Sequence, residues 1–345
     1  MPTTQIKTPY KIEERTTNNK TKYYLVKNIK INTKKIKIIK YIGTNKPTKE
    51  NIPILFTENM KEMETRAAKK RAEYFTTELL DKETVIELET LSSMYKIFKK
   101  LLTANETSVY EENFEIAYVH GTTAIEGNTL TKEETFDVLV NGILPKDKTL
   151  REVNEVQNFK KVKQYRDKYK GKVTLDFIKT LHSLIMHNID NDSAGYFRRI
   201  DNVAISGCDI SVTPSELIED ELTEIITDYY FALDKGSHPF EEASLFHYRF
   251  EMIHPFTDGN GRVGREVFNF MLNKSGYPKL LFLGSAKPKY IKMLKLGNEE
   301  QYQEMVAGFV ELMINQRLDV LMANLLKILV MPVRQGQSRL EDFFF

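Results

Sequence analysis

The chain has 345 residues, of which 41% are hydrophobic and 28% charged, and its formal net charge at pH 7 is +2. This composition is that of an ordinary soluble globular protein with room for one large core and an appendage, and the single cysteine, Cys208, excludes an internal disulfide framework. No run reaches the roughly 18 to 20 apolar residues that a membrane-spanning helix needs, and residues 1–14 lack the apolar centre of a signal peptide, so we expect a cytoplasmic protein without a membrane partner.

The charge is concentrated at the N-terminus. Residues 1–50 carry thirteen Lys and Arg against three Glu, a balance of +10, which leaves −8 for the rest. Two β-type runs, residues 23–26 and 36–42, are separated by residues 28–35 and predict a basic hairpin or small sheet within residues 1–55. Such a face can bind nucleic acid or an acidic protein; the open alternative is that its lysines only keep a sheet edge soluble.

From about Thr57 onward the pattern becomes helical, with residues 56–107 expected as scaffold helices. Three capping boxes predict helix starts, and in the third Pro214 takes the first helical position. The boxes are Thr131 with Glu134, Thr149 with Glu152, and Thr213 with Glu216. The helical histidines lack metal-ligand spacing and are predicted to be structural. They are His120, His182, His187 and His247.

Two short segments interrupt the helical pattern. Thr122 and Glu126 are four residues apart and therefore share a helix face, and Gly127 is predicted to end that helix. Between Gly195 and Gly207, β-branched residues alternate with small ones, which predicts a short β-ribbon. The alternating residues are Val203, Ala204, Ile205 and Ser206.

The stretch from residue 254 to 265 concentrates anion-binding features. Gly259 and Gly261, on either side of Asn260, are predicted to turn through left-handed conformations and present bare backbone N–H groups as a nest. Apolar residues at helical spacing follow, so we expect the nest at a helix N-terminus, where the dipole also favours phosphate. Arg262 and Arg265 are expected in its first turn, where cations are unfavourable unless they hold an anion.

Two further side chains in this stretch suit phosphate chemistry. Asp258 offers a carboxylate to Mg²⁺, and His254 has an ordinary pKa near 6.5, which suits a general base. Residues 259–264 also match the dinucleotide pattern G-x-G-x-x-G, but that pattern must follow a strand. Here the preceding residues, 244–253, follow Pro239 and predict a helix. A nucleotide site of another kind is therefore favoured.

This stretch resembles the H-x-F-x-[DE]-G-N-G-R-x-x-R signature of Fic (filamentation induced by cAMP) proteins at every defined position. The resemblance covers roughly residues 108–312 and implies an all-α fold with a short β-hairpin flap. It implies transfer of AMP from ATP to a Ser, Thr or Tyr hydroxyl of a target protein. By resemblance, His254 would deprotonate the hydroxyl, Asp258 would hold Mg²⁺, and Arg262 and Arg265 would hold the β and γ phosphates. The implied ATP-binding segment of this stretch also includes Gly259, Asn260, Gly261, Val263 and Gly264.

The other two segments resemble further parts of the Fic family. Residues 122–127 are similar to its inhibitory [ST]-x-x-x-E-[GN] motif, in the class whose inhibitory helix precedes the core. That resemblance implies that Glu126 pairs with Arg265 and switches the site off. Residues 195–207 resemble the flap that holds a target segment by strand addition, with a plain surface hairpin as the alternative. The resemblance implies that Val203, Ala204, Ile205 and Ser206 of this flap also belong to the ATP-binding site. Tyr290 and Asn298 resemble nucleoside-side contacts, although Ile291 stands where many members have a second tyrosine.

The C-terminal tail carries a separate motif. Residues 337–345 resemble the Q-x-x-[LIM]-x-x-[FY]-[FY] peptide (PIP-box) that docks on the replication sliding clamp, and the tail from 331 is expected to be flexible. Its residues of interest are Gln337, Leu340, Phe343 and Phe344. Leu340, Phe343 and Phe344 on one helical turn would present an apolar surface that suits a groove. Two alternatives stay open: the tail packs on the core of its own chain, or the tails of two copies pair.

The sequence therefore predicts a Mg²⁺-dependent protein adenylyltransferase held in check by Glu126. Its Fic domain is expected over residues 108–330, with the inhibitory helix at about 110–127. Two alternatives stay open: removal of AMP by the same site, and a clamp-binding, DNA-associated adaptor in which nucleotide chemistry is secondary. A homodimer is a further possibility.

Overall fold

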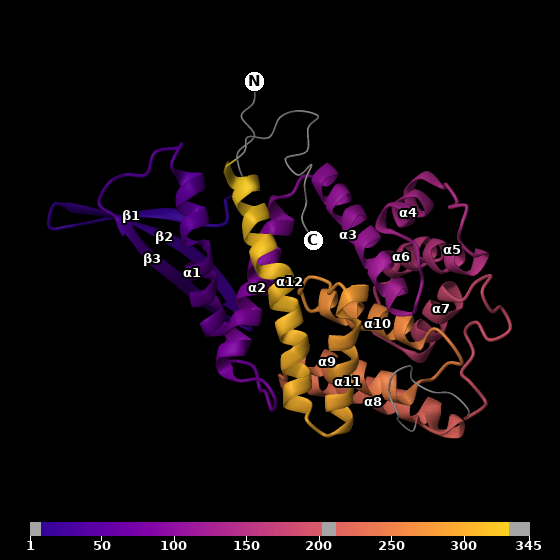
Figure 1. Cartoon of the computed structure of the whole chain (residues 1–345). Helices are drawn as coiled ribbons and strands as arrows, with labels where there is room; N and C mark the ends of the chain where they lie inside the picture. The colour runs from indigo at the N-terminus through magenta and orange to yellow at the C-terminus, as the bar shows by residue number, and fades with distance from the viewer. Residues whose placement is uncertain (1–7, 202–211, 331–345) are drawn as a thin grey trace. The chain divides into compact units, whose positions relative to one another are not determined.

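The computed structural model describes residues 8–201 and 212–330 (Figure 1). The chain divides into two compact units, each discontinuous along the sequence. Among the described residues, unit 1 takes 8–75, 81–111 and 314–330, and unit 2 takes 76–80, 112–201 and 212–313.

Unit 1 contains a three-stranded antiparallel sheet in the order β1-β2-β3. Its strands are β1 (Lys11–Thr17), β2 (Lys20–Ile31) and β3 (Lys34–Gly43). One face packs on α1 (Ile52–Ala72), where the Tyr10 hydroxyl donates to Glu64 at 2.8 Å and Lys27 pairs with the same carboxylate. Helix α2 (Lys82–Leu101) packs against α1. The predicted small basic sheet is confirmed.

The sheet is longer than the sequence indicated. Residues 28–35 were expected as a connection, but β2 and β3 run through them and leave only Asn32 and Thr33 for the turn. The reason is that Ile29 and Ile31 continue the alternation of β2 onto the face that packs on α1. Strand β1 was missed because its sequence, KIEERTT, has almost no apolar residue to alternate.

The remaining elements are helices, and the all-α prediction is confirmed apart from the small sheet. In chain order they are α3 (Ala104–Ile125), α4 (Lys132–Phe136), a π-helical turn (Asp137–Asn141), α5 (Leu150–Gln157), α6 (Phe159–Lys168), α7 (Leu175–Ile185), a 3₁₀ turn (Ser215–Leu217), α8 (Ile218–Lys235), α9 (Pro239–Ile253), α10 (Asn260–Lys274), a 3₁₀ turn (Gly284–Ala286), α11 (Lys287–Asn298) and α12 (Tyr302–Val330). Within the described ranges, no helix is both long and apolar enough to cross a bilayer.

Two of the three predicted capping boxes are confirmed, those of Thr131 and Thr149. The third is wrong. The Thr213 hydroxyl donates to Glu221 at 2.7 Å instead of capping a helix, residues 215–217 form a 3₁₀ turn, and α8 begins only at Ile218. The hydroxyl that was predicted to cap the helix is instead bound to the carboxylate of Glu221, eight residues later.

Helix α10 lies at the centre of unit 2. It packs against α9 and α7, and most of its side chains are buried. The apolar ones are Val263, Val267, Phe268, Phe270, Met271 and Leu272. The apolar spacing from Arg262 onward therefore marks a helix, as predicted. Because the apolar side chains of α10 are packed in the core, its N-terminus is held next to the polar stretch of residues 254–265.

Candidate active site

His254 ends α9 in a left-handed conformation, with φ 50° and ψ 58°. This is uncommon for a residue with a side chain and costs on the order of 1 kcal/mol, so the surroundings must hold it. Arg198 does so: its Nε donates to the His254 carbonyl at 2.9 Å, and its backbone N–H donates to Pro255. The bend at His254 ends α9 and begins the polar stretch of residues 254–265.

The imidazole of His254 is half-buried, with Nδ1 3.3 Å from the Glu251 carbonyl. A carbonyl can only accept, so Nδ1 carries the proton and Nε2 keeps a free lone pair. Burial lowers the pKa of His254, with the Glu251 carbonyl opposing and Arg198 adding to the shift. The ring is therefore a neutral base at pH 7.

The N-terminus of α10 is built differently from the predicted double-glycine bend. Gly259 caps the helix in the left-handed region, with φ 80°, as expected. The prediction was wrong for Gly261, which lies in the first helical turn with ordinary dihedrals. Its lack of a Cβ serves close packing instead, because that atom would lie 2.5 Å from Glu126 Oε1 and 2.7 Å from Arg265 Nη1. Asn260 closes the loop by accepting from Phe256 N–H and donating to Phe256 O.

His182 supports this loop, a role that the sequence did not reveal beyond a structural histidine. Its ring stacks on Phe256 at 3.7 Å, and its Nδ1 accepts from Gly195 N–H at 2.9 Å. Nε2 therefore carries the proton and donates to the Asp258 carbonyl at 3.0 Å. Burial lowers the pKa of His182 to about 4, which keeps the ring neutral.

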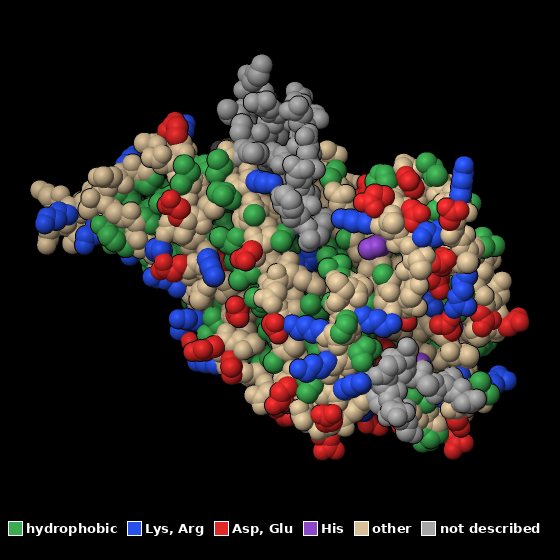
Figure 2. All heavy atoms as spheres, in the orientation of Figure 1, with side chains coloured by type: hydrophobic (Ala, Val, Ile, Leu, Met, Phe, Trp, Pro, Cys, Tyr) green, Lys and Arg blue, Asp and Glu red, His purple; other side chains and the backbone are tan. Residues whose placement is uncertain are grey.

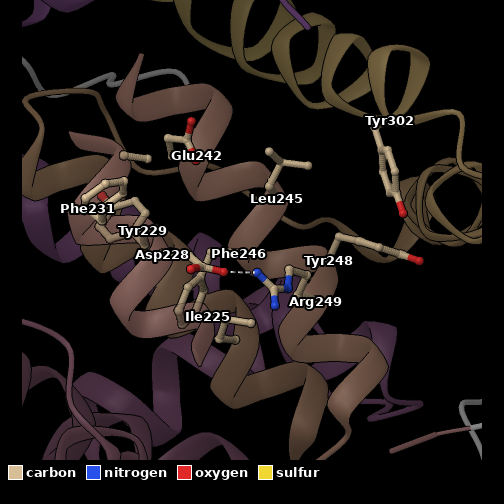
Figure 3. A pocket seen from close by; sticks show the side chains of 11 residues that line it. Ile225, Asp228, Tyr229, Phe231, Glu242, Leu245, Phe246, Tyr248, Arg249 and Tyr302 are labelled. Atoms are coloured by element: carbon tan, nitrogen blue, oxygen red, sulfur yellow. Dashed lines mark hydrogen bonds and ion pairs between the residues drawn. The ribbon is translucent and has the colours of Figure 1, made fainter. Parts of the chain in front are cut away.

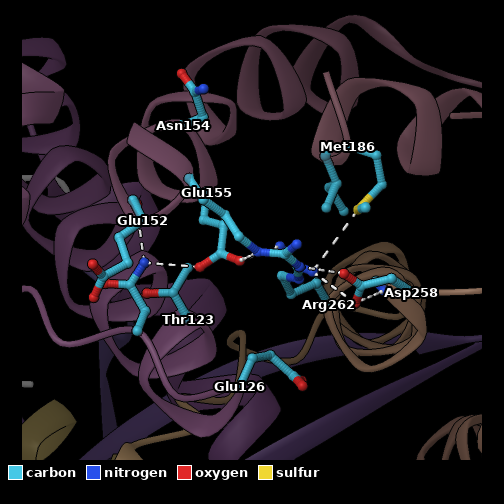
Figure 4. Close-up of polar contacts among 12 residues, drawn as sticks. Thr123, Glu126, Glu152, Asn154, Glu155, Met186, Asp258 and Arg262 are labelled. Carbon is cyan, nitrogen blue, oxygen red and sulfur yellow. Dashed lines mark hydrogen bonds and ion pairs between the residues drawn. The ribbon is translucent and has the colours of Figure 1, made fainter. Parts of the chain in front are cut away.

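Asp258 and Arg262 form an ionic cluster with two residues of α5 (Figure 4). Arg262 is only 1% exposed, and its Nη2 donates to Asp258 Oδ1 at 3.1 Å while Nη1 lies 3.4 Å from Glu155. Arg151 pairs with the other oxygen of Asp258. Burial would raise the pKa of Asp258, but Arg262, the Gly259 N–H and Arg151 together outweigh it and hold the pKa below its usual value. Arg262 Nε has no hydrogen-bond partner among the described residues, so this buried guanidinium retains a donor.

Arg265 is also 1% exposed and is held by the end of α3. It lies in the second turn of α10, not the first as predicted, because the helix begins at Asn260. Its Nε donates to Thr122 Oγ1 at 2.8 Å, and its Nη2 donates to Glu126 Oε1 at 2.5 Å. Gly127 ends α3 with φ 100°, which confirms the predicted helix stop. Burial would raise the pKa of Glu126, but Arg265 outweighs it and keeps the carboxylate ionised.

Known proteins are similar in sequence to this chain. The family model described as "Fic/DOC family" matches residues 172–272. The chain is 29% identical over 228 residues to protein adenylyltransferase Fic of Drosophila virilis, covering 64% of this chain and 45% of that protein. It is 30% identical over 186 residues to protein adenylyltransferase fic-1 of Caenorhabditis elegans, covering 52% of this chain and 36% of that protein.

Solved structures resemble the fold of this chain. A Fic domain containing signaling protein from Bacteroides thetaiotaomicron superposes with a TM-score of 0.59 at 26% identity, covering 70% of this chain and 96% of that one. Residues 172–272 are a Fic/DOC domain. Fic-1 (aa134–508) from C. elegans shares the fold, with a TM-score of 0.57 at 22% identity over 79% of this chain and 82% of that one. The chain spans less than half the length of the curated relatives named above.

The Fic domain has a buried carboxylate that the sequence did not single out. Glu251 lies one turn before His254 on α9, is 3% exposed, and its Oε1 has no hydrogen-bond partner among the described residues. Burial raises its pKa to about 7, although Arg265 opposes the shift. Tyr290, predicted to contact the nucleoside, is buried, with its ring centre 5.7 Å from the Arg265 guanidinium and its hydroxyl 2.9 Å from His247 Nε2.

Several predicted site residues lie in the flap, in the tail or at the end of α11. Residues 203–206 of the flap and Gln337, Leu340, Phe343 and Phe344 of the tail lie outside the described residues. Asn298 is half-buried at the end of α11, where its Oδ1 accepts from the Tyr248 hydroxyl at 3.0 Å.

The Fic domain also has a cavity of about 440 Å³ lined by residues of α8 and α9 together with Tyr302. Figure 3 shows Arg249 paired with Asp228 at its wall, at 2.6 Å. None of the predicted nucleotide residues lines it, so we assign it no part in the Fic chemistry.

Gly264→Ala is expected to destabilise the Fic domain. A Cβ at this position would lie 2.2 Å from Glu251 Oε1 and 2.9 Å from the Phe250 ring, on a neighbouring helix that cannot move without shifting His254. Overpacking of this kind costs about 1–3 kcal/mol, more than the ~1 kcal/mol that alanine gains in helix propensity. Thermal unfolding should show a lower Tm. Gly308→Ala is the matched control, because its Cβ meets only the flexible Met293 side chain; equal Tm changes in the two variants would contradict the packing argument.

Proposed function

We propose that the chain is a protein adenylyltransferase that transfers AMP from ATP to a Ser, Thr or Tyr hydroxyl of a target protein. The observation that carries the proposal is a neutral, half-buried imidazole beside the glycine-capped N-terminus of a buried helix. The names of the Drosophila and Caenorhabditis relatives support the same activity.

The geometry suits an in-line transfer at the α-phosphorus of ATP. The target hydroxyl oxygen forms a bond to that phosphorus, the bond to the β-phosphate oxygen breaks, and pyrophosphate leaves. His254 Nε2 takes the hydroxyl proton. The backbone N–H groups at the start of α10 stabilise the negative charge that moves to the leaving pyrophosphate.

The donor set fits a Mg²⁺ ion that arrives with the nucleotide. In the described ranges no group of three or more His, Cys, Asp or Glu side chains could hold a metal ion, so a cage made only of protein ligands is not offered there. Mg²⁺ usually binds one or two carboxylates together with phosphate oxygens, and Asp258, whose side chain is 41% exposed, provides one such carboxylate. When bound, the ion would neutralise charge on the phosphates.

Asp258→Asn is expected to raise the Mg²⁺ concentration needed for half-maximal AMP transfer by about tenfold or more, because the amide is a weaker ligand. Removing Mg²⁺ with EDTA should stop transfer by the wild-type chain. Asp192→Asn, on an exposed loop, is the control and should leave the Mg²⁺ requirement unchanged. The assignment fails if both variants need the same Mg²⁺ concentration.

We further propose that the chain inhibits itself through Glu126. In the described conformation Arg265 donates to both Thr122 and Glu126 and is fully buried, so it is not available to a γ phosphate. A carboxylate at this place would also repel phosphate oxygens.

Labelled ATP tests the reaction class. We expect label from the α position of ATP to become attached to protein, an intact-mass increase of one AMP, and release of pyrophosphate. Label from the γ position should stay in solution. Protein labelled from the γ position would indicate a phosphotransferase and overturn the proposal.

A second candidate is removal of AMP from a modified target. It is favoured by the Glu126 side chain, which is ionised and 35% exposed beside Arg265 and can therefore orient a water molecule. His254 would then give a proton to the leaving hydroxyl. Release of AMP from an adenylylated target by the wild-type chain, and its loss in Glu126→Gly, would support this candidate over transfer.

A further inference from the structure

The far end of the sheet in unit 1 is a two-stranded ribbon. Strand β1 pairs with β2 only up to Val26, whereas β2 and β3 remain paired to Ile31 and Lys34. Residues 27–38 therefore form a ribbon of two strands joined by a tight turn at Asn32–Thr33. Two strands lie about 4.8 Å apart, so this ribbon is narrow enough to enter a groove about 12 Å wide.

The two faces of the ribbon differ sharply. The inner face carries Ile29, Ile31 and Ile38, and it is anchored to α1 by the pair between Lys27 and Glu64. The outer face of the ribbon has no apolar residue. It consists of Asn28, Lys30, Lys35 and Lys37, all exposed.

Cross-strand pairing on the outer face puts like charges together. Lys30 stands directly opposite Lys35, and Asn28 stands opposite Lys37. Opposed like charges destabilise a sheet unless an anion lies between them. Glu13 of β1, which reaches Lys37 of β3, is already shared by Arg15 and Lys37, at 3.4 Å and 2.7 Å.

The outer face of the rest of the sheet carries further lysines beside the cross-strand pairs Val26–Ile39 and Tyr24–Tyr41. Lys11, Lys20 and Lys22 lie on the same side and are exposed. Arg15 lies 4.6 Å above the ring of Tyr24, which packs against Tyr41. Over residues 11–43 there are ten Lys and Arg against two Glu. Figure 2 shows Lys and Arg side chains on the part of the surface where Figure 1 draws the sheet.

We propose that this outer face binds duplex DNA, with the β2–β3 ribbon in the major groove. The excess positive charge complements the phosphates. Lysine and asparagine are side chains that hydrogen-bond base edges in that groove, and Asn28, Lys30 and Lys35 stand at the end of the ribbon that enters it. Double-stranded RNA is disfavoured because its major groove is too narrow and deep. A membrane surface is disfavoured because the ribbon's outer face offers nothing apolar to insert.

Fluorescence anisotropy of the full chain with a labelled 20-base-pair DNA duplex, from 50 to 200 mM NaCl, tests the proposal. The variant Lys22→Glu/Lys30→Glu/Lys35→Glu should bind at least tenfold more weakly at 50 mM NaCl. Because each phosphate contact contributes about 0.9 to the slope of log K against log salt, the slope should fall by about 2 to 3. The control Lys82→Glu/Lys161→Glu/Lys168→Glu carries the same charge change on exposed helix residues and should stay within about twofold of wild type.

Competition identifies the partner. An RNA duplex of the same sequence and vesicles containing phosphatidylserine should compete poorly with the DNA duplex. Equal loss of binding in the two triple variants would show only a general charge effect and overturn the proposal, as would a preference for RNA or for vesicles. If no DNA binding is detected, the proposal is also overturned, and the lysines serve only to keep the sheet soluble. Thermal unfolding of both variants checks that the sheet remains folded, and none of these results depends on AMP transfer.

Discussion

Glu126→Gly is expected to raise the rate of AMP transfer from ATP by about 10 to 100-fold. The substitution removes the carboxylate that accepts from Arg265 at 2.5 Å, so the guanidinium keeps only Thr122 as a partner and can turn toward a γ phosphate. The range follows from the 1–3 kcal/mol typical of coupling between an inhibitory contact and a site. Label from the α position of ATP, followed on protein over time, measures the rate.

Two controls separate charge from chain flexibility. Glu126→Gln keeps the size of the side chain and removes its charge, so it should also increase transfer, but by less than glycine does. Glu133→Gly introduces the same glycine at an exposed position beyond the end of α3 and should leave the rate unchanged. If Glu126→Gly labels protein at the wild-type rate, the proposal of self-inhibition is wrong.

His254→Ala is expected to lower transfer by about 10² to 10⁴-fold, the usual contribution of a general base. The loss should appear in kcat more than in KM for ATP, because Nε2 is proposed to act on the target hydroxyl and not on the nucleotide. The same loss is expected when His254→Ala is combined with Glu126→Gly, because the higher rate of Glu126→Gly makes the loss measurable. His187→Ala, with a half-buried histidine outside the site, is the control. Transfer that survives His254→Ala would exclude this base.

The pH dependence should report the same imidazole. Burial lowers the pKa of His254 below its ordinary 6.5, so the base form predominates at pH 7 and the rate should be flat above that. The rate should fall as pH drops below 6.5, with its midpoint at the lowered pKa. Burial also lowers the pKa values of His182 and His247, to about 4 and about 3. At these three histidines the unfolded chain binds more protons than the folded chain, so the free energy of unfolding should decline from pH 6.5 downward. Glu251, whose pKa burial raises to about 7, contributes in the opposite direction and makes the decline smaller. Circular dichroism must therefore confirm folding at each pH.

The comparison of sequence and structure separates local features from long-range ones. The helix stop at Gly127, the cap at Gly259 and the boxes of Thr131 and Thr149 were predictable because each depends on neighbours within four residues. Thr213 shows the limit of that approach, since its hydroxyl is taken by Glu221, eight residues away.

The sequence by itself determined the chemistry of the site: a base, a carboxylate and a glycine-led helix start within twelve residues, in the order that marks a Fic domain. Only the tertiary structure decided which partners surround these groups. Arg151 and Glu155 reach Asp258 and Arg262 from α5, and His182 fixes the loop from α7. These contacts join residues about 75 to 110 positions apart and carry no spacing signal. They arise because the buried apolar faces of the helices pack together, and that packing brings the polar ends to one place.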